Sequence, residues 1–174
     1  YNEPLNTSTR GSRKEFPAVA VIVAESNKVT IYDGDDPSLP MWWTVSGASN
    51  NSGQSLFYTG VLDDGSGASI FALNGSITLG ISYANQNGGV RILNFAKDVV
   101  KRITENVTYN GYWNSIESVR DGTADTQDTS IDPIVDHTVN DVAMTVLPNA
   151  PIDPATGLPI PTIAVATDGG VSVI

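Results

Sequence analysis

Short stretches of alternating apolar and polar residues, separated by turns rich in Gly, Asn and Asp, run through most of this chain. The clearest example lies at residues 162–166 and 171–174, which flank the turn Thr167-Asp168-Gly169-Gly170. Successive side chains of a strand point to opposite faces, so this alternation predicts two half-buried strands. We expect the Asp-Gly pair to supply the positive φ that a tight hairpin turn needs.

The same pattern predicts strands over most of the remaining chain. They are expected at residues 16–24, 28–32, 41–45, 56–62, 68–73, 76–83, 90–95, 98–104 and 139–146. Asn74-Gly75 gives the strongest hairpin signal among them. Residues 98–104 also carry apolar residues at a helical spacing, but the paired Val99 and Val100 favour a strand. The five prolines of residues 148–161 predict a loop.

Three groups of strands resemble one another, at about residues 16–45, 68–104 and 139–174. Each contains a related strand, VTIY, VRIL or VSVI, that follows an apolar strand and a small polar turn. The repeated unit is predicted to be a four-stranded antiparallel meander, which is typical of a β-propeller blade.

We therefore expect an all-β fold made of propeller-like blades, with about two and a half blades in an incomplete ring. Residues 16–174 would form this region. Residues 1–15 lack periodicity and predict a linker or docking arm, and the polar residues 105–138 predict a long insertion. The chain ends on an apolar strand, so we expect it to be part of a longer polypeptide, or to have another subunit cover that strand.

Composition agrees with a turn-rich β protein, because 16 Gly and 10 Pro accompany only 16% charged residues. The net charge of −10 argues against binding to nucleic acid or to an anionic membrane, since phosphate recognition needs a basic patch. No apolar run approaches the length of a membrane span. With no Cys, disulfides and thiolate metal sites are excluded.

The candidate chemical groups favour ordinary structural roles. His137 is the single histidine, and no G-x-S-x-G motif accompanies it to suggest a triad. The acidic turn at residues 33–36 suggests calcium, but the EF-hand register would require an acid where Thr44 stands. Asp63 and Asp64 are typical of a solvated turn more than of a glycosidase pair. We expect no catalytic residue, no metal site and no cofactor.

Aromatic residues give the only indication of ligand binding. Trp113 and Tyr112 lie in the predicted insertion, and Trp42 and Trp43 lie in a predicted strand. Their flat faces would suit stacking on sugars. Strict alternation would place one of Trp42 and Trp43 in the core and the other against a neighbouring blade or chain. Trp113 in a loop is the stronger candidate for glycan contact.

The segment VATDGGVSVI resembles the strand-turn-strand of WD-like and YVTN-like propellers. The run RKEFPAVAVIVAESNKVTIYDGDDPSLPMWWTV, with FALNGSITLG, GGVRILNF and VNDVAMTV, resembles virion proteins of tailed phages, especially marine ones. The resemblance covers roughly residues 12–174. It implies a linker followed by a propeller region.

This resemblance implies a non-enzymatic virion protein, a tail fibre or appendage component located in the virion that assembles with further copies or other virion proteins. A host-surface glycan is the expected external partner. The alternative is a secreted or cell-surface adhesin that binds carbohydrate. A propeller hydrolase is the weakest hypothesis, because the sequence offers no catalytic constellation.

Overall fold

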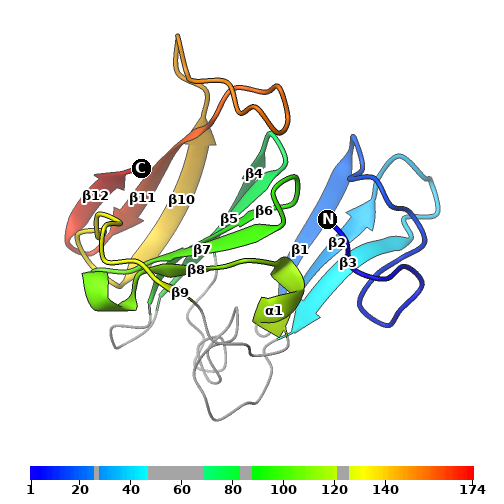
Figure 1. Ribbon diagram of the computed structural model, residues 1–174, viewed down its shortest axis with the longest axis horizontal. Coiled ribbons are helices and arrows are strands. Elements are labelled where there is room, and N and C mark those ends of the chain that lie inside the picture. The colour runs from blue at the N-terminus through cyan, green and yellow to red at the C-terminus, as the bar shows by residue number, and fades with distance from the viewer. Residues whose placement is uncertain (26–27, 47–68, 83–87, 121–125) are drawn as a thin grey trace.

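The structure is a computed structural model that describes residues 1–25, 28–46, 69–82, 88–120 and 126–174. It is almost entirely β, with antiparallel sheets in which sequential strands are neighbours (Figure 1). The predicted all-β fold built of antiparallel meanders is therefore confirmed, and the sheets leave an open arrangement with no closed barrel among the described strands. The predicted strand at residues 56–62 and the pair Asp63-Asp64 lie outside the described residues.

Three sheets, here called the first, central and third sheets, make up the described part of the chain. The first sheet contains β1 (Ala20–Glu25), β2 (Lys28–Asp33) and β3 (Met41–Ser46). The central sheet contains β4 (Ser69–Leu73), β5 (Ser76–Ile81), β6 (Gly89–Asn94), β7 (Val99–Ile103), β8 (Gly111–Trp113) and β9 (Thr126–Gln127). The third sheet contains β10 (Val139–Thr145), β11 (Thr162–Thr167) and β12 (Gly170–Val173).

In the described part of the chain, the strand counts per sheet are three, six and three, where the sequence predicted units of four. The two strands by which the central sheet exceeds four come from residues 105–138, which were expected to be a long insertion. They contain the 3₁₀ helix η1 (Val107–Tyr109), strands β8 and β9 and the short helix α1 (Ile116–Arg120). Because β8 pairs with β7, this segment extends the central sheet.

Two hydrophobic cores form on opposite faces of the central sheet. Strand β5 shows why, since every residue of it is buried. Ile77 and Leu79 point into the core shared with the first sheet. Thr78 points the other way, and its hydroxyl lies 3.4 Å from the sulfur of Met144 in the third sheet. The central sheet is thus the middle of three layers (Figure 1).

A glycine allows the central and third sheets to approach closely. A Cβ at Gly80 would lie 2.6 Å from a methyl of Val139 and 3.0 Å from one of Val142. Neither distance is compatible with an ordinary carbon contact. The absence of a side chain at Gly80 therefore sets the spacing of this second core.

Two hairpins test the predicted turn chemistry. Asn74 and Gly75 have φ values of 51° and 74°, the positive pair that a two-residue type I′ turn requires. The β11–β12 hairpin also forms, but its positive φ is at Gly170, at 133°, and not in the Asp168-Gly169 pair. The position of this hairpin was predicted correctly and its internal geometry was not.

Candidate functional site

Residues of the N-terminal arm, residues 1–15, lie along the free edge of β3. The amide of Thr44 donates to the carbonyl of Thr9 at 2.9 Å, and the amide of Gly11 donates to the carbonyl of Trp42 at 3.0 Å. These bonds satisfy backbone groups that an uncovered sheet edge would expose. The arm therefore completes the first sheet.

Arg10 anchors this arm. Its side chain is fully buried, with the guanidinium 4.0 Å from the ring centroid of Trp42. Its two terminal nitrogens donate to the carbonyls of Trp42 and Lys14, at 2.7 and 2.8 Å. Burial lowers the pKa of Arg10, but the ring face and the carbonyls stabilise its charge inside the protein.

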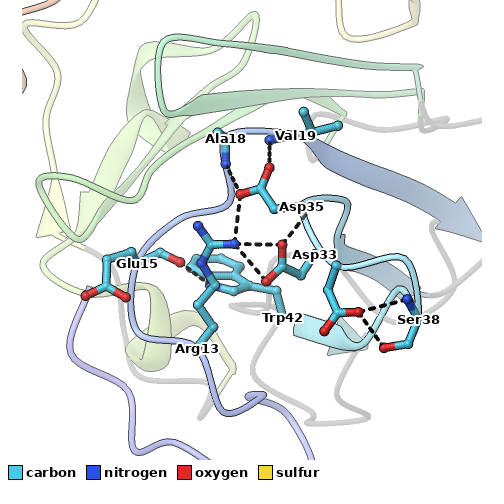
Figure 2. Close-up of polar contacts among 9 residues, drawn as sticks. Arg13, Glu15, Ala18, Val19, Asp33, Asp35, Ser38 and Trp42 are labelled. Carbon is cyan, nitrogen blue, oxygen red and sulfur yellow. Dashed lines mark hydrogen bonds and ion pairs between the residues drawn. The ribbon is translucent and has the colours of Figure 1, made fainter.

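Arg13 links the arm to the acidic turn at residues 33–36 (Figure 2). One nitrogen of its guanidinium lies 2.8 Å from Asp33 and 2.8 Å from Asp35. The hydrogen bond to Asp33, followed by that to Asp35, raises the pKa of Arg13. The two carboxylates therefore have a cation of the protein itself as their partner.

Backbone amides complete the turn. Asp35 accepts from the amides of Ala18 and Val19, at 2.9 and 3.0 Å. The Ala18 bond, followed by the Arg13 bond, lowers the pKa of Asp35. Asp36 accepts from the amide and the hydroxyl of Ser38, which lowers its pKa as well. These contacts describe an Asx-type turn that fixes the residues leading into β1.

The three tryptophans proposed for glycan stacking lie in the core. Trp42, Trp43 and Trp113 are each 1% exposed. Trp113 belongs to strand β8, not to a loop, and the Arg102 guanidinium lies 5.5 Å from its ring centroid. As the protein is folded, none of these indoles presents a face to a sugar.

A β-bulge explains why both Trp42 and Trp43 are buried. In the β2–β3 register Ile31 pairs with Trp43 and Tyr32 pairs with Met41, so that Trp42 is an extra residue. A bulge interrupts the strict alternation of faces. Both side chains therefore lie in the first core, where Trp42 also packs beneath the N-terminal arm.

Tyr112 is the one of the four proposed residues whose side chain is only half-buried, whereas Trp42 lines the groove beside the N-terminal arm with an indole that is 1% exposed. Tyr112 belongs to β8 and lines a groove of about 730 Å³ together with Lys101, Asp128, Asp132 and Val173. An aromatic ring with a cation and carboxylates nearby offers both stacking and hydrogen bonding.

A cluster of three titratable side chains joins the central sheet to the segment before β10. The donor atoms of Glu105, Asp136 and His137 all lie within 4.8 Å of one another. His137 Nδ1 is 2.9 Å from a Glu105 carboxylate oxygen, and the His137 amide also donates to this oxygen at 3.3 Å. The sequence predicted only an ordinary structural role for His137, because Glu105 is remote in sequence and no spacing motif connects the two.

A scan against protein-family models and searches of curated proteins and solved structures found no match to this chain. Its function is therefore argued from its own residues. In the part of the chain that the structure describes, no helix is both long and apolar enough to span a membrane.

Proposed function

We propose that this chain is a non-enzymatic structural component of a tailed-phage virion, part of a tail fibre or appendage, whose propeller-like sheets associate with further copies. The single observation that carries the assembly part is the apolar character of the outward faces of the first and third sheets. The virion assignment rests on the resemblance of the sequence to phage virion proteins.

On the first sheet, the outward face includes a row of valines in β1. Val21 and Val23 are 41% and 39% exposed, whereas their neighbours Ala20, Ile22 and Ala24 pack toward the core. Across the sheet, Thr30 and Thr44 pair on the same face as Val23, with their hydroxyls 3.0 Å apart, but Thr30 is only 4% exposed. The accessible part of this face is therefore the pair of β1 valines, on which a second sheet can pack.

On the third sheet, the outward face is built from small apolar residues in register. Ala143 pairs with Ala164, which pairs with Val173. Ala166 pairs with Val171 one step along the strands. The two valines are 70% and 67% exposed, at positions 173 and 171 respectively. Sheets with such faces pack about 10 Å apart.

The two outward faces could pack against other sheets face to face, as the three sheets of the chain already pack against one another. A second copy that placed its first sheet on the third sheet of its neighbour would bury both rows of valines. Repeated contact of this head-to-tail kind would give a ring or a filament, according to the rotation between copies. An appendage protein built in this way needs no catalytic group.

The assembly is tested by measuring mass in solution by sedimentation across a range of protein concentrations. We expect oligomers, and we expect Val21→Asp and Val173→Asp each to shift the population toward monomer because a charge would be buried at the contact. Leu147→Asp, an equally drastic change at a half-exposed residue outside both faces, is the matched control. A wild-type chain that stays monomeric at every concentration would contradict the proposal.

The virion assignment has its own test. Antibodies raised against the chain, used in electron microscopy of purified phage particles that encode it, are expected to label the tail or its appendages. Labelling absent from intact particles, with the protein found only in the infected-cell lysate, would overturn the assignment.

The alternative, a carbohydrate-binding adhesin, is favoured by the groove that contains Tyr112 and Lys101. It predicts binding on a glycan array that Tyr112→Ala removes and Tyr109→Ala, at a nearby exposed tyrosine, leaves unchanged. An array without any signal would leave the structural role as the better explanation.

A further inference from the structure

We propose that Glu105, Asp136 and His137 form a binding site for one divalent transition-metal ion of the zinc type. The site offers one imidazole nitrogen and two carboxylate oxygens from two segments of the chain that are about thirty residues apart in sequence. The ion would hold the end of β7 against the segment that leads into β10.

The geometry of the donor atoms fits a small ion. Donor atoms around a tetrahedral zinc, each about 2.0–2.1 Å from the metal, lie about 3.3 Å from one another. The three donors here lie within 4.8 Å of one another, and those of His137 and Glu105 are 2.9 Å apart. A pair at the 4.8 Å limit would have to move about 1.5 Å closer to reach this spacing, which rotation of the side chains can provide.

His137 Nδ1 is the second reason to propose a cation. This atom is shielded from solvent and has no hydrogen-bond partner of acceptable geometry among the described residues, although it lies close to the carboxylate of Glu105. A lone pair on Nδ1 that faces a carboxylate oxygen is unfavourable unless a proton on Nδ1, or a cation bound to both atoms, relieves the repulsion. A metal ion coordinated by Nδ1 and by Glu105 would be such a cation. A proton on Nδ1, which the neutral imidazole can also carry, is the other possibility, and titration with a metal distinguishes the two.

The backbone around the cluster is held in place before any ion binds. Thr104, next to Glu105, receives the amide of Ile134 on its carbonyl at 3.1 Å, and its own amide donates to the buried Asn110 at 2.7 Å. Asp136 uses one oxygen to cap the amide of Thr138 at 2.7 Å. Its other oxygen remains for a metal.

The β11–β12 turn closes over the same point. A Cβ at Gly169 would lie 2.9 Å from the Cβ of Asp136, so the glycine allows this close approach. The amide of Asp168 donates to the carbonyl of Thr138 at 3.2 Å. An ion at the cluster would thus join the end of β7 to the segment before β10, against which the β11–β12 turn already packs.

The donor set selects the class of metal. One nitrogen with two carboxylates suits Zn²⁺, Co²⁺ or Mn²⁺, whereas Ca²⁺ requires six to eight oxygens and Mg²⁺ prefers an all-oxygen octahedron. Three protein ligands leave a position for water, and the three side chains are half-buried, so solvent can reach it. We therefore expect Zn²⁺ to bind more tightly than Ca²⁺.

The test is calorimetric titration of the chelator-treated full chain with ZnCl₂. We expect the titration to give one ion per chain, with binding at least about tenfold weaker in Glu105→Gln and Asp136→Asn. A separate thermal scan should show a higher melting temperature with Zn²⁺ than without it. Both substitutions preserve side-chain shape, and the side-chain carbonyl that Asp136→Asn introduces can still accept from the Thr138 amide. Asp132→Asn, at an exposed carboxylate of the same segment, is the matched control and should bind like the wild type.

A second measurement requires no variant. Since His137 is the single histidine, its imidazole nitrogens give one set of NMR signals, and Zn²⁺ at one equivalent should shift them. No saturable Zn²⁺ binding, binding that both variants retain, or imidazole signals that do not respond to Zn²⁺ would each overturn the proposal.

Discussion

The side chain of Asp35 shows how a single charge positions the start of a strand. Its carboxylate accepts from two consecutive amides, those of Ala18 and Val19, and contacts the guanidinium of Arg13 (Figure 2). All three donors favour the charged carboxylate, so its pKa in the folded protein lies below the ordinary value of 3.8. The ionised form therefore contributes stability.

The pH dependence of this contribution follows from its sign. A carboxyl group whose pKa is lower in the folded than in the unfolded protein stabilises the fold above its unfolded pKa, and the effect is lost as pH falls through the folded pKa. We expect Asp35→Asn to lower the free energy of unfolding at pH 6, and the difference from wild type to shrink as the pH falls below about 4.

Urea unfolding at several pH values measures this difference. Asp132→Asn is the control, because among the described residues no hydrogen bond to the Asp132 side chain is found. A wild-type advantage over Asp35→Asn that is the same at pH 2.5 and pH 6 would show that the carboxylate charge is not what stabilises the turn.

Residue patterns predicted part of the candidate sites and not the rest. The acidic turn and the aromatic residues stand out in the sequence because their members are adjacent. The burial of Trp42 depends on a bulge and on Arg10 above its ring, and neither leaves a local signal. The Glu105–His137 contact likewise depends on which strands become neighbours, a property of the fold as a whole.

At the scale of elements, the N-terminal arm behaves as an added edge of the first sheet. Its backbone bonds to β3 involve Thr9 and Gly11, and the buried Arg10 closes over Trp42. The apolar groove beside it contains the rings of Phe16 and Phe95, whose centroids are 5.4 Å apart. The arm is thus held both by backbone hydrogen bonds and by aromatic packing.

Removing the Arg10 side chain should detach this arm. We expect Arg10→Ala to lower the free energy of unfolding by about 3 kcal/mol, because two carbonyls lose a charged donor and the Trp42 ring loses its cation. Hydrogen exchange should show lost protection at the Gly11 and Thr44 amides. Lys14→Ala, which removes an exposed cation nearby, should change stability by less than about 0.5 kcal/mol.

An Arg10→Ala protein that keeps slow exchange at both amides would show that backbone pairing alone holds the arm. In that case the buried guanidinium would be a consequence of the docking and not its cause.

The strands that were predicted well have strong local signals. Residues 28–32 alternate clearly, residues 41–45 are rich in aromatic and β-branched residues, and β2 and β3 exceed these bounds by one residue each. The strand predicted at residues 16–24 begins only at Ala20 in β1, because Phe16 and Pro17 are apolar for another reason: Phe16 packs against the first core and Pro17 is buried. Strands β8 and β9, of three and two residues, are too short to show any period.

At the scale of the whole molecule, the central sheet separates two hydrophobic cores, one on each of its two faces. The first core contains Ile31 of the first sheet and the second contains Ile163 of the third. Each outer sheet has only three described strands, which is the minimum expected to be stable with one packed face. We infer that neither outer sheet is stable without the central one.

This inference predicts one cooperative unfolding transition in scanning calorimetry. Ile31→Ala and Ile163→Ala make the same truncation on opposite sides of the molecule, and each should cost about 2–5 kcal/mol. Because the layers unfold together, both variants should lower the same melting temperature, by about 4–20 °C for a chain of this size. Leu147→Ala, at a half-exposed residue, should leave the melting temperature nearly unchanged.

Two resolved transitions, each shifted by only one of the isoleucine variants, would show that the outer sheets unfold independently and that the three-layer packing is not a single folding unit.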